Sequence, residues 1–430
     1  MPELPKPTAG DTAWFVHDRF GMFIHWGLYA LPSRHEWVQS VEEISPDVYR
    51  KYFEHFNPTL FDPHQWARTA RAAGMKYVVL TSKHHEGFCL WDSQFTDYKV
   101  TNTPYGKDLL KPFTEAFRAE GLKVGFYYSL LDWHHPDFPI DIYHPLRNHP
   151  EVETLNAGRD IKRYAEHMRN QVHELLTAFQ PDILWCDFSY PDAIYKGLPG
   201  KDRNDWESEK LLALVRELSP RVIMNNRLDL PAKADIYTPE QIQLQEWLKI
   251  DGEPVVWEAC HTFSGSWGYH RDEDTWKSPE QLIQLLINTV SLGGNLLMNV
   301  GPTSLGTFDV RAIKALACYR DWMALHSASI YGCTQSDYTA PRDCRLTQNG
   351  NKIYIHIYAW PLQFLFLEGL ADKVEFARFL HDGSEVQINT NNWHINELKR
   401  YGLKEKTLVL NLPIKRPDVI VPVIELLLKG

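Results

Sequence analysis

The segment Pro181-Asp-Ile-Leu-Trp-Cys-Asp-Phe-Ser-Tyr190 decides the predicted fold. Residues 183–185 form a short apolar run of the strand type, and Asp187 lies where this strand should end. A helical pattern at residues 160–179 precedes it. If the strand belongs to a buried parallel sheet, its C-terminal carboxylate points into the mouth of the fold, where α/β barrels place their chemistry.

The same pairing of a helix with a following strand recurs through the first three quarters of the chain. We expect strands at 20–27, 77–81, 123–128, 183–187, 221–227, 254–258 and 294–300, and helices at 61–73, 108–120, 160–179, 207–218, 279–292 and 309–325. Such alternation predicts right-handed crossovers and a parallel sheet. The fold class is therefore α/β, an irregular (β/α)8-like barrel. The long segment 228–254 has little helical pattern, so we expect a functional loop there.

The pattern changes near residue 336, where strands follow one another without helices. We expect them at 352–358, 373–379, 407–412 and 419–426, and Asn349-Gly350 is a hairpin signal. The predicted domains are a catalytic barrel at 1–335 and a C-terminal antiparallel β-sandwich at 336–430.

Charge and hydropathy restrict the partners. The 430-residue chain has a formal net charge of −10 and a pI near 6.0, which argues against a nucleic-acid partner. It has no apolar run of about 18 residues, so we predict no membrane span. The 15 tryptophans suit stacking on sugar faces, although tryptophan also fills cores.

The six cysteines and the first residues bear on location. No two cysteines form a C-x-x-C pair, as expected for free thiols in a reducing cytoplasm. The N-terminal residues lack the charged-then-apolar pattern of a signal peptide, so we predict a cytoplasmic location. A signal peptide removed before the first residue would leave the same sequence.

Polar and aromatic side chains gather at the predicted strand ends: His25, His84, His85, Glu86, Tyr128, Asp187, Arg227 and Glu258, with Glu240 from the long loop. Retaining glycoside hydrolysis needs a carboxylate nucleophile and a carboxylic acid about 5–5.5 Å apart. Asp187 fits the nucleophile, and Glu240 or Glu258 fits the acid. Histidines and Arg227 would bind ring hydroxyls.

A zinc site is the competing interpretation. His25, His84, His85 and Asp187 are residue types that ligate zinc. However, two adjacent histidines on an extended segment point in opposite directions, so we expect no metal. Each of these residues alone is more often a cap, an ion-pair partner or a hydrogen-bonded structural group. Their coincidence at strand ends is what favours a site.

Five motifs resemble the bacterial α-L-fucosidases of glycoside hydrolase family 29. They are Phe20-Gly-Met-Phe-Ile-His-Trp-Gly-Leu-Tyr29, Tyr77-Val-Val-Leu-Thr-Ser-Lys-His-His-Glu-Gly-Phe88, Gly125-Phe-Tyr-Tyr-Ser129, Leu184-Trp-Cys-Asp187 and Ser266-Trp-Gly-Tyr269. The resemblance runs from about residue 14 to residue 322. It implies a retaining exo-α-L-fucosidase that needs no cofactor and acts on a fucosylated oligosaccharide or glycoconjugate.

The resemblance also implies residue roles, with Asp187 as the nucleophile. The residues expected to bind substrate are His25, His84 and His85 on the fucose hydroxyls, Tyr128 and Trp185 in the subsite wall, Arg227, the Glu36-Trp37 pair that closes the pocket, and Trp267. A Thr-Pro-Glu motif makes Glu240 the preferred acid/base. Glu258 is the alternative and is interpreted as structural support.

Two other functions stay open at this stage. One is a non-catalytic fucose-binding barrel, and the other is a metal-dependent barrel hydrolase. A homo-oligomer is compatible with the sequence.

Overall fold

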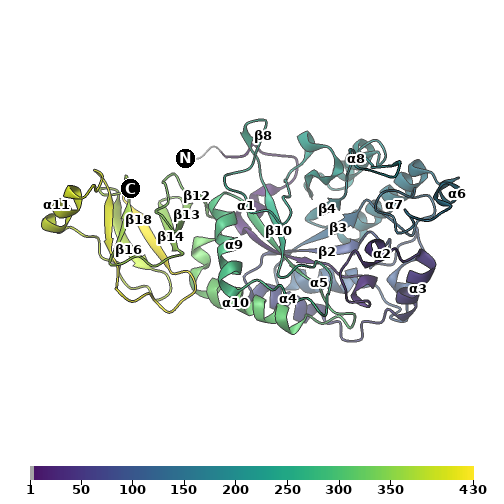
Figure 1. Ribbon diagram of the computed structural model, residues 1–430, viewed down its shortest axis with the longest axis horizontal. Helices are drawn as coiled ribbons and strands as arrows, with labels where there is room; N and C mark the ends of the chain where they lie inside the picture. Colours follow the sequence, from purple (N-terminus) through teal and green to yellow (C-terminus); the bar gives the residue numbers. More distant parts are fainter. Residues whose placement is uncertain (1–3) are drawn as a thin grey trace.

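The computed structural model describes residues 4–430, and its first part is a curled sheet of seven parallel strands surrounded by helices (Figure 1). The strand order is β10-β11-β1-β2-β3-β4-β7. Their bounds are Phe20–Ile24 (β1), Tyr77–Lys83 (β2), Lys123–Ser129 (β3), Ile183–Asp187 (β4), Ile223–Met224 (β7), Glu258–Thr262 (β10) and Asn295–Val300 (β11). The predicted α/β, (β/α)8-like class is confirmed.

Helices cover the outside of this sheet. The longer ones are α1 (Thr12–Asp18), α3 (Pro46–His55), α4 (Pro63–Ala72), α5 (Leu110–Ala119), α7 (Ile161–Phe179), α8 (Ser208–Leu218), α9 (Pro279–Ser291) and α10 (Val310–His326). Short turns of helix are α2 (Val38–Val41), α6 (Val152–Asn156), η1 (Leu28–Ala30), η2 (Val100–Asn102), η3 (Asn226–Leu228), η4 (Pro231–Lys233) and η5 (Ser327–Ser329). Side-chain caps fix where helices begin: Asp160 accepts from the N–H of Lys162, and Ser278 forms a capping box with Gln281.

An irregular extended segment joins the two edges of the sheet. Residues 236–240 make parallel bridges on one side to Asn225, next to β7, and on the other to Trp257 and Cys260 of the β10 side. The segment therefore takes the place of a further strand and closes the barrel. The sequence predicted a functional loop at 228–254, and this closing strand lies within it.

Two of the predicted strands differ most from the observed bounds. The strand expected at 221–227 is shortened to β7 because the Asn225 side chain bonds the backbone of Cys186 on β4, through N–H···Oδ1 at 3.1 Å and Nδ2–H···O at 2.8 Å. The strand expected at 254–258 begins only at Glu258. Residues Glu253–Pro254 (β9) instead pair with Lys249–Ile250 (β8) in a small hairpin.

The barrel interior is one buried cluster that takes alternate residues from the strands: Phe23, Tyr77, Val79, Tyr127, Ile183, Trp185, Ile223, Ile236, Cys260 and Leu297. Tyr127 thus faces inward. Its neighbour Tyr128 faces the helix layer, where its hydroxyl donates to Gln171 of α7 at 2.8 Å.

The C-terminal part contains antiparallel sheets, as predicted. One has the order β12-β13-β14-β18-β16 and the other pairs β15 with β17. Their bounds are Thr334–Gln335 (β12), Cys344–Asn349 (β13), Lys352–Ile357 (β14), Phe364–Leu367 (β15), Val374–Phe379 (β16), Leu408–Asn411 (β17) and Val423–Leu428 (β18). Helix α11 (Asn392–Arg400) was not predicted.

This part packs against α9 and α10 at one end of the barrel (Figure 1). Trp322 of α10 donates to the carbonyl of Ile420 at 2.9 Å, and Tyr358 donates to Asn288 of α9 at 2.8 Å. The division into domains at 335/336 stays a prediction. All six cysteines are free thiols. Across residues 4–430, no helix combines the length and the apolar character needed to cross a bilayer.

Candidate active site

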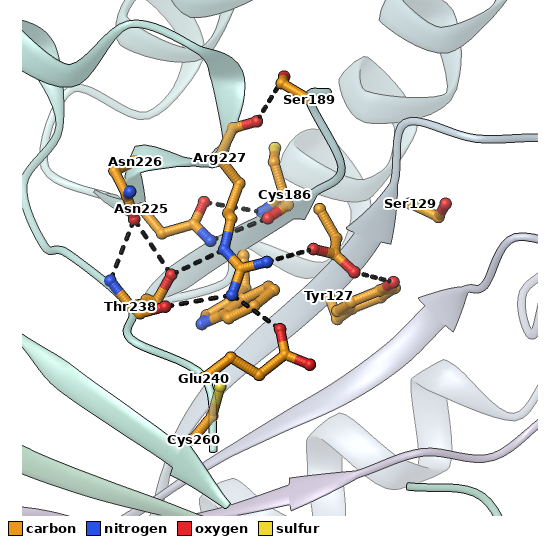
Figure 2. A network of polar contacts seen from close by, with 12 residues as sticks. Tyr127, Ser129, Cys186, Ser189, Asn225, Asn226, Arg227, Thr238, Glu240 and Cys260 are labelled. Carbon is orange, nitrogen blue, oxygen red and sulfur yellow. Dashed lines mark hydrogen bonds and ion pairs between the residues drawn. The ribbon is translucent and has the colours of Figure 1, made fainter. Parts of the chain in front are cut away.

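Arg227 is the centre of a polar network at the mouth of the barrel (Figure 2). One terminal nitrogen donates to Asp187 at 3.1 Å, and the other donates to Glu240 at 2.9 Å. Nε and Nη2 also bond the hydroxyl and carbonyl of Thr238, both at 3.1 Å. The guanidinium lies 5.0 Å from the ring centre of Trp185. A planar fork of donors can hold two carboxylates in fixed positions, which a lysine cannot do.

Three separate elements bring these groups together. Asp187 is the last residue of β4, Arg227 lies in η3 after β7, and Glu240 ends the bridged part of the closing segment. The residues that directly follow the two carboxylates, Phe188 and Gln241, both have positive φ, at 79° and 54°. This left-handed conformation is uncommon for residues with a side chain, and it turns the chain sharply beside each carboxylate.

Asp187 is buried, but neighbouring side chains bond both of its carboxylate oxygens. Burial raises its pKa to about 6, while the positive charge of Arg227 opposes this rise and the charge of Glu240 adds to it. The Tyr127 hydroxyl donates to the second oxygen of Asp187 at 2.7 Å and also opposes the rise. Asp187 is therefore mainly ionised at pH 7.

A small cavity of about 60 Å³ opens in front of Asp187. Its wall is made by Phe23, His25, Glu36, Trp37, His84, His85, Tyr127, Trp185, Asp187, Phe188, Glu240, Cys260 and Trp267. The structure thus brings together nine of the residues singled out from the sequence: His25, Glu36, Trp37, His84, His85, Trp185, Asp187, Glu240 and Trp267. Arg227 joins them through its bonds to the two carboxylates.

The three histidines of the wall are neutral. Burial lowers the pKa of His25 to about 3 and holds the pKa values of His84 and His85 well below their usual range. The Asn299 amide nitrogen donates to the Trp267 carbonyl at 2.6 Å, so its oxygen, 2.7 Å from His25 Nδ1, accepts a hydrogen bond from the Nδ1–H group of that ring. Nε2 of His25 is then an acceptor, which suits a sugar hydroxyl.

Glu36 ties two loops of the cavity wall together. One carboxylate oxygen accepts from the backbone N–H groups of Trp267 at 3.1 Å and Gly268 at 2.9 Å. Burial raises the pKa of Glu36, and these hydrogen bonds counteract the rise. The bonds fix the positions of Trp37 and Trp267 on their two loops.

The expectation at Tyr128 is wrong by one residue. Tyr127 lines the cavity and bonds Asp187, whereas Tyr128 points to α7. Adjacent residues of a strand face opposite sides of a sheet. Both tyrosines lie in a continuous buried run, so the sequence does not show which one faces the barrel interior.

Glu258 lies inside the barrel and does not line the cavity. Its carboxyl group accepts from the Tyr77 hydroxyl at 2.5 Å and from Trp185 Nε1 at 3.3 Å. Burial raises its pKa to about 7. This placement beside Trp185 is what a supporting role requires.

Tyr127, Asn299 and Phe188 are site residues that the sequence did not single out. Asn299 carried a usable signal, since it comes at the end of the predicted last strand, just before Gly301-Pro302. Phe188 directly follows Asp187 and was quoted only as part of its segment. Within residues 4–430, no three or more His, Cys, Asp or Glu side chains are placed to hold a metal ion together.

Comparisons with known proteins agree on one family. The family model for α-L-fucosidase matches residues 7–328. Human plasma α-L-fucosidase is 31% identical over 390 residues, which cover 81% of this chain and 76% of the human protein.

Solved structures give the same result. α-L-Fucosidase isoenzyme 1 from Paenibacillus thiaminolyticus superposes with a TM-score of 0.90 at 44% identity, covering 97% of this chain and 99% of that one. A family 29 α-L-fucosidase from Bacteroides thetaiotaomicron, trapped as a covalent intermediate with 2-fluoro-fucosyl fluoride, has a TM-score of 0.82 at 28% identity, covering 100% and 98%.

A covalent intermediate is the signature of a retaining, double-displacement mechanism. Neither a binding-only barrel nor a metal-dependent hydrolase finds support in these relatives. The chain belongs to the α-L-fucosidase family, glycoside hydrolase family 29, whose members are retaining enzymes.

Proposed function

We propose that this chain hydrolyses terminal α-L-fucosides with Asp187 as the nucleophile and Glu240 as the acid/base. One observation carries the assignment. A single guanidinium group holds both carboxylates, and both of them line the same cavity. Retaining glycosidases need such a pair close together.

The two carboxylates differ in the way the two roles require. The Asp187 side chain is 10% exposed and is held by Tyr127 and Arg227, so it is a fixed, ionised group. The Glu240 side chain is 41% exposed at the mouth of the cavity. A group there can exchange its proton with water and reach the oxygen of a departing group.

The reaction then has two balanced steps. Asp187 attacks the anomeric carbon, the bond from that carbon to the leaving oxygen breaks, and Glu240 gives its proton to this oxygen. In the second step Glu240 takes a proton from water, the water oxygen bonds to the anomeric carbon, and the ester bond to Asp187 breaks. Glu240 must be protonated for the first step, so its ion pair with Arg227 opens when substrate binds.

The rest of the wall suits L-fucose. Neutral His25, His84 and His85 offer ring nitrogens to the hydroxyls of the sugar, and Nε2 of His25 is an acceptor because its Nδ1 donates to Asn299. Fucose lacks a 6-hydroxyl, so its C6 is a methyl group, and the aromatic rings of the wall offer this methyl an apolar contact. Homo-oligomer formation and a cytoplasmic location stay predictions from the sequence.

Azide rescue tests the assignment. Release of 4-nitrophenol from its α-L-fucoside is measured for wild type, Asp187→Gly and Glu240→Gly, with and without sodium azide. We expect both variants to lose activity and to regain it with azide. The Asp187 variant should give a β-fucosyl azide, since azide attacks the substrate directly, and the Glu240 variant an α-fucosyl azide, since azide attacks the glycosyl-enzyme.

Glu258→Gln is the matched control, because Glu258 is the other carboxyl group beside the site. Its activity should not respond to azide. Full activity of Glu240→Gly together with azide rescue of Glu258→Gly would move the acid/base role to Glu258.

A further inference from the structure

Two neighbouring side-chain amides, Asn225 and Asn226, follow β7 and bond the chain on opposite sides of the site (Figure 2). Asn225 bonds the backbone of β4 beside the proposed nucleophile, and Asn226 bonds the closing segment beside the proposed acid/base. Neither takes part in the proposed chemistry. We propose that Asn226 is a positioning residue that keeps the Glu240 carboxyl group within reach of the leaving oxygen. The inference rests on the proposed function.

The side chain of Asn226 takes over where the backbone pairing of the closing segment with β7 ends. The N–H groups of Asp235 and Ile236 both donate to the Met224 carbonyl, at 2.9 and 3.2 Å. The chain then leaves β7 and enters η3, so it offers no further strand carbonyl to the closing segment. At Thr238 the side-chain oxygen of Asn226 accepts the backbone N–H instead, at 3.0 Å. A side chain therefore determines where the closing segment lies at this point.

The Thr238 hydroxyl strengthens this connection. It donates its one proton to the same Asn226 oxygen at 3.1 Å and accepts from Arg227 Nε at 3.1 Å. Glu240 lies two residues farther along the chain, and Pro239 stands between them. Because the proline ring fixes one of the backbone angles on this path, a displacement of Thr238 also displaces Glu240.

The connection matters most while Glu240 carries its proton. In the resting structure the Glu240 carboxylate is held by Arg227 at 2.9 Å. A protonated carboxyl group has no charge to maintain this ion pair, and the Glu240 side chain is 41% exposed rather than enclosed by the protein. The reach of the acid is then set by the backbone from which it extends, and on the β7 side Asn226 holds that backbone through Thr238.

Asn225 provides a contrast of the same residue type. It accepts from the Cys186 N–H at 3.1 Å and donates to the Cys186 carbonyl at 2.8 Å, directly before Asp187. Attack by Asp187 is needed whatever group departs, whereas a positioned acid is needed only when the departing group is too basic to leave without a proton. The two asparagines should therefore differ in how their loss depends on the leaving group.

Leaving-group dependence provides the test. kcat/KM, which reports the reaction up to departure of the leaving group, is measured for phenyl α-L-fucoside and for α-L-fucosyl fluoride. Phenolate needs a proton to leave, and fluoride needs little help. In Asn226→Ala we expect the ratio of phenyl to fluoride kcat/KM to fall about tenfold relative to wild type, which is part of the roughly 100-fold to 10,000-fold that a positioned acid contributes.

Asn225→Ala is the matched control and should lower both rates by a similar factor, so that the ratio stays as in wild type. Thr238→Val keeps the backbone N–H and removes only the hydroxyl bond. It should lower the ratio by a smaller factor, and it decides the question if Asn226→Ala does not fold.

Equal losses for the two substrates in Asn226→Ala or in Thr238→Val would overturn the inference while the proposed function stands. An equal fall of the ratio in Asn225→Ala would overturn it too, because the effect would then not be specific to the acid. Wild type that hydrolyses neither substrate would overturn the proposed function and the inference together.

Discussion

Asp187 and Glu240 share one counter-ion: the two terminal nitrogens of the Arg227 guanidinium bond one carboxylate each, at 3.1 and 2.9 Å. Arg227 thereby sets the separation of the two groups and opposes the rise that burial causes in the pKa of Asp187. Both effects come from one side chain, so a substitution of Arg227 changes them together.

Arg227→Met should lower kcat/KM at pH 7 about 100-fold, a loss typical of misplaced catalytic groups. Without the positive charge the pKa of Asp187 rises, so the acid limb of the kcat/KM profile moves to higher pH. Hydrolysis of 4-nitrophenyl α-L-fucoside between pH 4 and 9 measures both. Arg400→Met, on the exposed face of α11, is the control. An unmoved acid limb would show that Arg227 does not set the Asp187 charge.

Wild-type kcat/KM should fall below about pH 6, because the nucleophile is lost when Asp187 is protonated and its pKa is about 6. Tyr127→Phe removes the 2.7 Å hydrogen bond that lowers this pKa, so the acid limb should move upward and kcat/KM at pH 7 should fall about tenfold. Tyr128→Phe is a matched control one residue away, whose hydroxyl bonds only Gln171 among the described side chains. A shift in Tyr128→Phe but not in Tyr127→Phe would reverse our placement of the two rings.

Glu258 should make the fold less stable as the pH rises. Its pKa is raised from 4.5 to about 7 in the folded chain, so its favourable contribution is complete below pH 4.5 and is lost as the pH rises through 7. Relative to wild type, Glu258→Gln should gain about 3 kcal/mol in the free energy of unfolding between pH 4.5 and pH 8. Urea titrations at both pH values measure this.

Glu42 provides a control of opposite sign for that experiment. The hydrogen bond from Arg34 lowers the pKa of Glu42 below 4.5, so its contribution is present above pH 4.5 and is lost as the pH falls below that value. Relative to wild type, Glu42→Gln should therefore lose stability as the pH rises to 4.5 from below and should change little between pH 4.5 and pH 8. The same sign in both variants would contradict the explanation.

The buried pair of Lys83 and Asp132, 3.2 Å apart, lies just behind the two cavity histidines His84 and His85. Lys83→Met leaves the Asp132 carboxylate buried without its cation and should lower the free energy of unfolding by about 3–5 kcal/mol. Lys404→Met breaks the exposed pair with Glu368 and should cost less than about 1 kcal/mol. Chemical denaturation of the two variants compares them directly. Equal losses in the free energy of unfolding would mean that burial does not determine how much these ion pairs stabilise the fold.

The sequence predicted the parallel sheet and most of the cavity because, at each strand end, the apolar run that indicates a strand is followed directly by the polar residues that indicate a site. The apolar runs before Asp187 and His25 gave the strands, and the polar residues after them gave the site. Where a strand lacks an apolar run, the prediction failed. Residues 236–240 close the barrel through single bridges. Ile236, Tyr237 and Thr238 are residue types that favour strands, but Pro239 ends this run after three residues, which is too short to indicate a strand.

The sequence also did not predict the direction in which buried side chains point. Tyr127 and Tyr128 are both fully buried, and only the pairing of Tyr127 with the inward-facing Trp185 of β4 distinguishes them. Asn299 was missed for a related reason: its role depends on contacts with His25 and Trp267, which lie more than thirty residues away in the chain. Such contacts follow from the tertiary arrangement alone.

The position of β1 between β2 and β11 has a consequence for the order of synthesis. β1 ends at Ile24 and its partner β11 begins at Asn295, so the ribosome makes the 270 residues 25–294 between them. At about 5–20 residues per second this takes roughly 15–50 s, during which β1 has β2 as its only neighbour in the sheet. His25 cannot meet Asn299 before then. A nascent chain released before residue 300 therefore lacks a complete sugar pocket, and activity reports that the whole barrel has been made and closed.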